Sequence, residues 1–246
     1  MTQTRSQQFV ESVLDLRPRV AVFDCDGTVW ENNSGEDFLE WSLQHQLVSA
    51  EMAAFMRTRY DDYKSGKVGE VEMCGEMVTM YSGQAVAEMD AAAARFFAEI
   101  VAANIFPEML ELTQRLSEQG CDLWAVSSTN EWVIREGVKQ FEIPADHVLA
   151  GAAAITNGVV TDQLTRMPSG EGKAVALREV VLPKLPKDMA NPGREIDAVF
   201  GNSIHDAAML HLAKRAFAVN PNPDLAALAQ RAGWTIYWPE KMVVDR

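Results

Sequence analysis

The sequence predicts an α/β protein with a doubly wound, mostly parallel sheet and an inserted all-helical segment. Three observations support this fold class. An apolar strand comes early in the chain, strands alternate with helices from about Pro107 onward, and the stretch between them has helical periodicity with almost no strand signal. Strands that alternate with helices are typical of a parallel sheet with crossover helices. We therefore assign residues 1–30 and 106–246 to the α/β core and residues 31–105 to the helical insertion.

The first predicted strand covers residues 19–23 and runs directly into the turn DCDGT, which begins at Asp24. Because side chains alternate along a strand, Asp24 and Asp26 are expected on one side and Cys25 on the other. An apolar strand that ends in an acidic, glycine-bearing turn is typical of the carboxyl edge of a parallel sheet. This is the edge at which α/β proteins place their functional sites.

Four helices are predicted in the insertion. Ser34 is a candidate N-cap for the first of them, and Glu36 and Asp37 place negative charge in its first turn, where the helix dipole favours it. The predicted helices cover residues 34–48, 50–64, 68–81 and 84–103.

Strands and helices alternate through the rest of the core. Gly120 is a C-cap signal for a helix over 107–119, and Asn157-Gly158 is a hairpin signal between two short strands. A helix begins near Lys173, and the proline- and glycine-bearing residues 183–194 predict a loop. The other predicted elements are strands 122–126, 147–155, 159–164, 196–200, 216–219 and 235–237, with helices at 131–140, after 206 and at 223–232.

Composition excludes several classes of protein. The 246 residues are 48% hydrophobic and 23% charged, as in a globular protein, and the formal net charge of −13 disfavours binding to nucleic acid or to an anionic membrane. The three cysteines do not form a disulfide framework or a zinc motif. No apolar run approaches the roughly 20 residues that span a bilayer, and the N-terminus has no signal-peptide core. We expect a cytoplasmic protein.

The two aspartates of the DCDGT turn are the strongest chemical signal. Two carboxylates brought close together can bind Mg²⁺ through oxygen. One of them can also attack a phosphorus atom, and the other can pass a proton to the leaving oxygen. Gly27 permits a tight turn beside a ligand. The pattern therefore predicts a site for phosphate chemistry at Asp24 and Asp26.

The sequence resembles the haloacid dehalogenase-like phosphohydrolases over nearly its whole length. Four motifs match in order: FDCDGT, the strand-end serine of LWAVSST, SGEGKA with Lys173, and GNSIHDAAML with Asn202 and Asp206. We take Ser127 as the matching serine, with Ser128 as its rival. The tail AVNPNPDLAALAQRAGW and the helical insertion are similar to the phosphoserine-phosphatase-like branch, in which the insertion forms a cap over the site.

The resemblance implies a Mg²⁺-dependent phosphomonoester hydrolase that acts on a small soluble metabolite through a phospho-aspartate intermediate. Asp24 would attack phosphorus, and Asp26 would protonate the leaving alcohol and then activate water. The residues implied to bind the phosphate are Thr28, Ser127, Ser128 and Lys173. The residues implied to hold the metal are Asp24, Asp26, Asn202 and Asp206.

One residue departs from the family pattern. The family usually has an aspartate where this chain has Asn202. An amide oxygen can still bind a metal, but one negative charge is lost, so weaker Mg²⁺ affinity is expected. Asp26 favours phosphate chemistry over dehalogenation. The dehalogenases that give the superfamily its name need no Mg²⁺ and lack this second aspartate.

A residue-by-residue comparison with the phosphoserine enzymes predicts a different substrate. Those enzymes recognise serine with a glutamate shortly after the first motif and an arginine on a cap helix. At the corresponding places this chain has Asn33, with Glu31 nearby, and Gly75 or Met77. The lack of an arginine argues against phosphoserine, and Glu31 and Asn33 are candidate substrate contacts.

The composition of the insertion suggests a different leaving group. Residues 31–105 contain 13 Asp or Glu and 5 Lys or Arg. With Trp30, Trp41, Tyr63 and Tyr81, this acidic segment is suited to a cationic or neutral leaving group such as an amino-alcohol phosphate. The alternative is that the acids coat solvated helix faces and the aromatic rings pack inside the bundle.

Two other functions fit the same motifs. A phosphotransferase or mutase would use a second hydroxyl in place of water. A catalytically weakened protein would bind a phosphorylated metabolite without turnover, and Asn202 is the feature that favours it. The partner expected in each case is a small phosphomonoester, and the sequence does not specify an oligomeric state.

Overall fold

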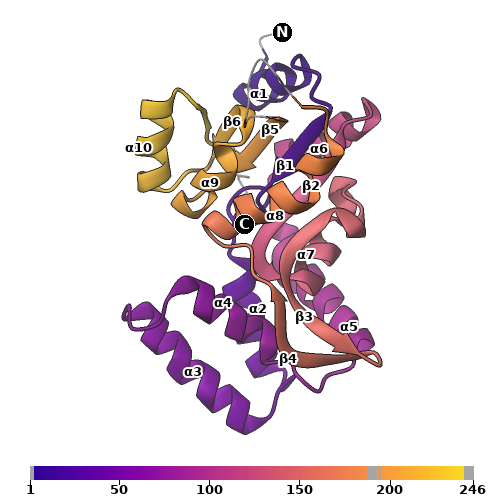
Figure 1. Ribbon diagram of the computed structural model, residues 1–246, viewed down its shortest axis with the longest axis vertical. Helices are drawn as coiled ribbons and strands as arrows, with labels where there is room; N and C mark the ends of the chain where they lie inside the picture. Colours follow the sequence, from indigo (N-terminus) through magenta and orange to yellow (C-terminus); the bar gives the residue numbers. More distant parts are fainter. Residues whose placement is uncertain (1–2, 188–192, 194, 241–246) are drawn as a thin grey trace.

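A seven-stranded sheet forms the centre of the molecule (Figure 1). The computed structural model describes residues 3–187, residue 193 and residues 195–240. The strand order is β4-β3-β2-β1-β5-β6-β7, and every neighbouring pair is parallel except β3 and β4. The strands are β1 Val20–Phe23, β2 Asp122–Asn130, β3 Val148–Thr156, β4 Val159–Arg166, β5 Ile196–Gly201, β6 Ala213–Val219 and β7 Thr235–Tyr237. The predicted α/β fold class is confirmed.

The strand β1 lies at the point where the winding of the sheet changes direction. From β1 the chain builds outward through β2 and β3 on one side, and later through β5, β6 and β7 on the other. All four residues of β1 are buried, because helices cover both faces of the sheet. Ligands of open α/β sheets bind beyond the carboxyl ends of the strands at such a switch point. The DCDGT turn follows β1 at this position.

Helices surround the sheet and fill the insertion. The helices α2–α4 lie below the sheet in Figure 1, next to the β3–β4 hairpin, and α5 lies beside α7. The helices are α1 Arg5–Leu14, α2 Ser34–Gln44, α3 Ala50–Lys64, α4 Glu70–Thr79, α5 Val86–Phe96, α6 Pro107–Glu118, α7 Glu131–Gly137, α8 Glu171–Val180, α9 Ala207–Leu210 and α10 Pro223–Ala232. Among the described residues, no helix has both the length and the apolar character needed to cross a membrane.

Several boundaries differ from those predicted. The helix expected over 84–103 is α5 followed by a π-helical turn, Phe97–Val101, and a short 3₁₀ turn. The helix after residue 206 is the single turn α9. Helix α1 was not predicted; Thr4 and Gln7 cap it reciprocally. Of the predicted loop over 183–194, residues 188–192 and 194 lie outside the described residues.

Strand β2 is longer than predicted and this difference affects the site. We expected it to end at residue 126, where the apolar run stops, but it continues to Asn130 with a shift in its pairing with β3. The polar side chains of Ser127 and Thr129 are buried, and hydrophobicity alone gave no signal for this extension. The extension places both side chains on the same face of the strand.

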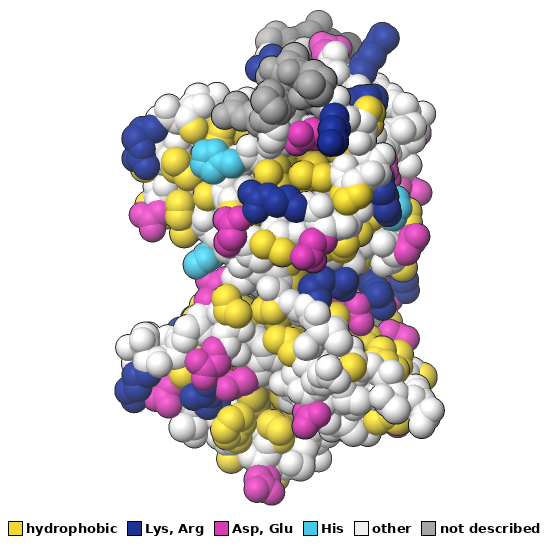
Figure 2. All heavy atoms as spheres, in the orientation of Figure 1, with side chains coloured by type: hydrophobic (Ala, Val, Ile, Leu, Met, Phe, Trp, Pro, Cys, Tyr) yellow, Lys and Arg dark blue, Asp and Glu magenta, His cyan; other side chains and the backbone are white. Residues whose placement is uncertain are grey.

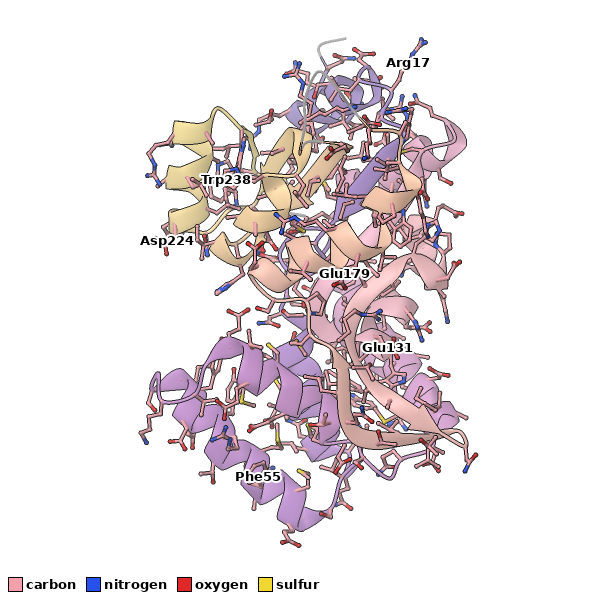
Figure 3. All side chains as sticks on the ribbon, viewed as in Figure 1. Arg17, Phe55, Glu131, Glu179, Asp224 and Trp238 are labelled. Carbon is pink, nitrogen blue, oxygen red and sulfur yellow. The ribbon has the colours of Figure 1, made fainter. Side chains whose placement is uncertain are left out.

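The insertion packs tightly against the core near the C-terminal end of helix α7. The ring of Trp30 lies 5.8 Å from that of Phe97 and 6.0 Å from that of Phe141. Gly137 is required there, because an added Cβ would come within 2.8 Å of both Trp30 and Phe97. Glu131 begins α7 and lies 3.4 Å from Arg166 of β4, which ties this helix to the hairpin (Figure 3).

Candidate active site

A cavity of about 290 Å³ lies between the carboxyl ends of the central strands and the helices of the insertion. The space-filling view shows the molecule indented on one side between these two parts (Figure 2). The predicted site residues that line the cavity are Asp24, Asp26, Glu31, Asn33, Ser127, Ser128, Lys173 and Asn202. Residues from four motifs and from the insertion therefore meet at one place.

Asp24 is buried at the end of β1 with a partner on each carboxylate oxygen. The Thr28 hydroxyl donates to Oδ2 over 2.7 Å, and Nζ of Lys173 donates to Oδ1 over 2.7 Å. Burial, and then the charge of Asp206, raises the pKa of Asp24 to about 7 against the lowering effect of Lys173. The two hydrogen bonds orient the carboxylate. Its shifted pKa is typical of a catalytic group and suits a nucleophile.

Lys173 joins two buried carboxylates. Its ammonium group lies 2.7 Å from Asp24 and 2.5 Å from Asp206, and only 3% of the residue is exposed. Burial alone would lower the pKa of Lys173, but the two aspartates outweigh it and raise the pKa above its usual value. Lys173 therefore keeps its charge inside the protein.

Asp206, for which we predicted a metal-ligand role, is not among the described residues that line the cavity and contacts Lys173. Its Oδ1 accepts from Lys173, and its Oδ2 accepts from the backbone N–H groups of Asn202 and Ser203, both over 2.9 Å. The residue is fully buried, and a Cβ at Gly201 would lie 2.6 Å from it. Asp206 holds Lys173 in place from behind the cavity wall, and its role as a metal ligand stays a prediction.

Thr28, for which we predicted a contact with phosphate, supports Asp24 in the structure. Its side chain is fully buried, and its hydroxyl donates to Asp24. By contrast, Ser127 and Ser128 both line the cavity, so the structure keeps both as candidate phosphate contacts. The hydroxyl oxygen of Ser127 accepts the backbone N–H of Thr129 over 3.1 Å, which leaves its proton for another acceptor.

Asp26 is held by three donors from two parts of the chain. Its Oδ1 accepts from the indole N–H of Trp30 over 2.6 Å and from the backbone N–H of Ser34 over 2.7 Å. Its Oδ2 accepts from the Thr129 hydroxyl over 2.7 Å. Neither Trp30 nor Thr129 was predicted to have this role. For Thr129 the available signal was its position two residues after Ser127, on the same face of an extended strand.

Gly27 is required where Asn202 approaches the first motif. Its φ of +73° favours glycine, and an added Cβ would lie 1.9 Å from Nδ2 of Asn202. The Gly27 carbonyl also accepts a hydrogen bond from Asn220 over 3.3 Å. The close approach brings Asn202 to the same end of the cavity as Asp24 and Asp26.

The oxygen donors at this end of the cavity fit a magnesium ion. Asp24, Asp26 and Asn202 supply carboxylate and amide oxygens, which are the hard ligands that Mg²⁺ prefers. In the described part of the chain, no group of three His, Cys, Asp or Glu side chains is placed to hold a metal. The third side-chain donor is an amide, so this donor set has one charge fewer than three carboxylates would have.

The insertion supplies the opposite wall. Beside Glu31 and Asn33 it contributes two tyrosines and two further glutamates, and Asn33 also caps α2 by accepting the N–H of Glu36. Of the four aromatic residues singled out from the sequence, Tyr63 lines the cavity, whereas Trp30, Trp41 and Tyr81 are buried in the core. The residues that the insertion contributes in addition are Asn32, Gly35, Glu36, Tyr60, Glu70, Met73, Cys74 and Met77.

Glu70 connects the insertion to the core across the cavity. It is the first residue of α4, and its carboxylate accepts from the Ser169 hydroxyl over 2.5 Å. Its other oxygen lies 2.7 Å from Nε2 of His205, a residue of the fourth motif. His205 lies on the cavity wall.

Comparison with known proteins identifies the family. The model of the haloacid dehalogenase-like hydrolases matches residues 21–211. The chain belongs to this family. Its match includes most of β1, the whole insertion and the turn that carries Asn202 and Asp206, so this haloacid dehalogenase-like hydrolase has all four motifs within the matched region.

Relatives place the hydrolase among the phosphatases of the phosphoserine-phosphatase-like branch. It is 25% identical over 221 residues to a phosphoserine phosphatase of Mycobacterium tuberculosis, covering 88% of this chain and 69% of the relative. It is 24% identical over 226 residues to a histidinol-phosphatase of Neisseria meningitidis, covering 88% and 97%.

Solved structures show the same fold. A protein of unknown function from Bordetella pertussis matches with a TM-score of 0.76 and 19% identity, over 89% of this chain and 98% of that one. A substrate-bound phosphoserine phosphatase matches with a TM-score of 0.59 and 13% identity, over 91% and 93%. At these identities the likeness shows the fold alone.

Removal of the Lys173 ammonium, which bridges Asp24 and Asp206, should strongly lower the stability of the protein. Lys173→Met leaves Asp24 and Asp206 buried side by side without a cation, so the free energy of unfolding should fall by about 3–5 kcal/mol, measured by urea denaturation. Lys67→Met, which removes an exposed lysine paired with Asp62, is the matched control and should have a much smaller effect. Equal effects of the two substitutions would contradict this account of the centre.

Proposed function

We propose that this hydrolase is a Mg²⁺-dependent phosphomonoesterase that acts on a small phosphorylated metabolite through a phospho-aspartate at Asp24. The observation that carries the proposal is the convergence of Asp24, Asp26 and Lys173 at one end of a cavity. The relatives named as phosphoserine phosphatase and histidinol-phosphatase support phosphomonoester chemistry. The cavity volume of about 290 Å³ supports a small substrate.

Asp24 and Lys173 carry out the first step in this proposal. A carboxylate oxygen of Asp24 forms a bond to phosphorus while the bond from phosphorus to the alcohol oxygen breaks. Lys173 places a fixed positive charge beside the attacking oxygen, and the Ser127 hydroxyl donates to a phosphoryl oxygen. Such preorganised groups supply most of the catalysis in phosphoryl transfer. A magnesium ion held by Asp24, Asp26 and Asn202 would neutralise charge on the phosphoryl group.

Asp26 moves the proton in both steps. In its acid form it gives a proton to the departing alcohol oxygen, and the resulting carboxylate then takes a proton from the water that attacks phosphorus. That attack breaks the bond between phosphorus and Asp24 and regenerates the free carboxylate. The hydrogen bonds from Trp30, Ser34 and Thr129 hold the Asp26 carboxyl group in a defined orientation for this exchange.

Replacement of the nucleophile tests the proposed function. Asp24→Asn should abolish phosphate release from p-nitrophenyl phosphate, because the amide is not a nucleophile, while circular dichroism shows that the fold is retained. The wild-type protein should release phosphate with Mg²⁺ and lose this activity with EDTA. Asp146→Asn, at an exposed position, is the control. Turnover by Asp24→Asn, or wild-type binding of phosphate esters without turnover in Mg²⁺, would refute the proposal.

The hydrogen bond from Thr129 predicts an effect that depends on the leaving group. Thr129→Val removes the donor that orients Asp26 but keeps the side-chain volume, so proton transfer from Asp26 should be slower. Alkyl phosphates, which need a proton on the leaving oxygen, should then react about tenfold more slowly. The rate with p-nitrophenyl phosphate should fall much less, because nitrophenolate leaves without a proton. Thr129→Ser should restore the alkyl phosphate rate. An equal loss with both substrates would show a merely structural role.

A further inference from the structure

We infer that the cavity selects phosphomonoesters whose alcohol carries a cationic group and no carboxylate. This inference rests on the proposed function and names its substrate class. The catalytic end of the cavity fixes where the phosphoryl group lies. The charge and hydrogen-bonding character of the opposite wall then determine what the leaving alcohol can carry.

The wall around the leaving alcohol is acidic. Glu31, Glu36 and Glu70 line the cavity beyond the catalytic aspartates. Among the described residues, Lys173 is the one lysine or arginine that lines it, and its ammonium is already bound by two buried aspartates. A carboxylate on the substrate would therefore meet three glutamates and, among the described lining residues, no lysine or arginine other than Lys173. Juxtaposed like charges of this kind reject a ligand strongly.

A lysine of this chain shows what the acidic wall accepts. The Lys64 ammonium lies 5.0 Å from the centre of the Tyr60 ring and 3.4 Å from both carboxylate oxygens of Glu36. A ring face and a carboxylate together attract an ammonium group. Both contacts to Glu36 are long, and the Lys64 side chain is 56% exposed, so a substrate ammonium can take its place. The other nearby cation, Arg59, is bound by Glu72 and Glu76.

The size of the cavity narrows the substrate class further. The small cavity leaves room for only a short alcohol beyond the phosphoryl group. His205, the remaining basic side chain at the wall, is paired with Glu70 at 2.7 Å.

The test is a comparison of phosphate esters that differ in one group. Phosphoserine is phosphoethanolamine with an added carboxylate, and glycerol 1-phosphate is a small neutral ester. With wild-type protein and Mg²⁺, kcat/KM for phosphoethanolamine or for L-histidinol phosphate should exceed that for phosphoserine by at least about 100-fold and that for glycerol 1-phosphate by at least about tenfold.

Substitutions in the cavity wall test which side chains cause the preference for cationic esters. Glu31→Gln and Glu36→Gln should each lower the ratio of kcat/KM for the preferred cationic ester to that for glycerol 1-phosphate by at least about fivefold, mainly through KM. Glu51→Gln removes an acid of the insertion at an exposed position outside the cavity and should leave the ratio unchanged. A ratio that is unchanged in both glutamine variants would overturn the inference.

The failure of this inference and the failure of the proposed function give different results. If phosphoserine or glycerol 1-phosphate is hydrolysed as well as the cationic esters, the inference is wrong and the phosphatase activity stands. If no ester is hydrolysed, including p-nitrophenyl phosphate, both are overturned. A preference for the cationic esters that disappears in the wall variants supports both.

Discussion

The site depends on one buried cation shared by two carboxylates. Lys173, from α8, is held between Asp24 at the end of β1 and Asp206 after β5. Without this cation the two carboxylates would repel each other in a region from which water is excluded. The same contacts join two neighbouring strands and a helix at the switch point of the sheet. The nucleophile is thus positioned by the interaction that stabilises this part of the fold.

A second constraint links the insertion to the chemistry. Asp26 belongs to the first motif, yet Trp30 and the backbone of Ser34, at the entrance to the insertion, donate to its carboxylate. Across the cavity, Glu70 joins α4 to Ser169 and His205 of the core. A change in the position of the insertion would therefore also disturb the proposed proton donor and the cavity wall. This arrangement gives a physical reason for the insertion to contribute to both catalysis and specificity.

The sequence predicted the sheet and the convergence of the motifs better than the roles of individual side chains. The DCDGT turn after an apolar strand indicated Asp24 and Asp26, because a strand end in a parallel sheet has a defined position. The contacts of Thr28 with Asp24 and of Asp206 with Lys173 were not predicted, since a sequence pattern does not show whether a polar side chain faces the cavity or supports a neighbour behind it. The extension of β2 to Thr129 was missed because its residues are polar although buried.

Identification of the phosphorylated residue tests the central claim most directly. The protein would be mixed with an excess of a hydrolysed ester and Mg²⁺, quenched in acid before the steady state, digested, and analysed by peptide mass spectrometry. Our account predicts a phosphoryl group on Asp24 that forms and decays at rates compatible with turnover. Phosphate release without a phosphorylated peptide, or with the phosphoryl group on another residue, would contradict it.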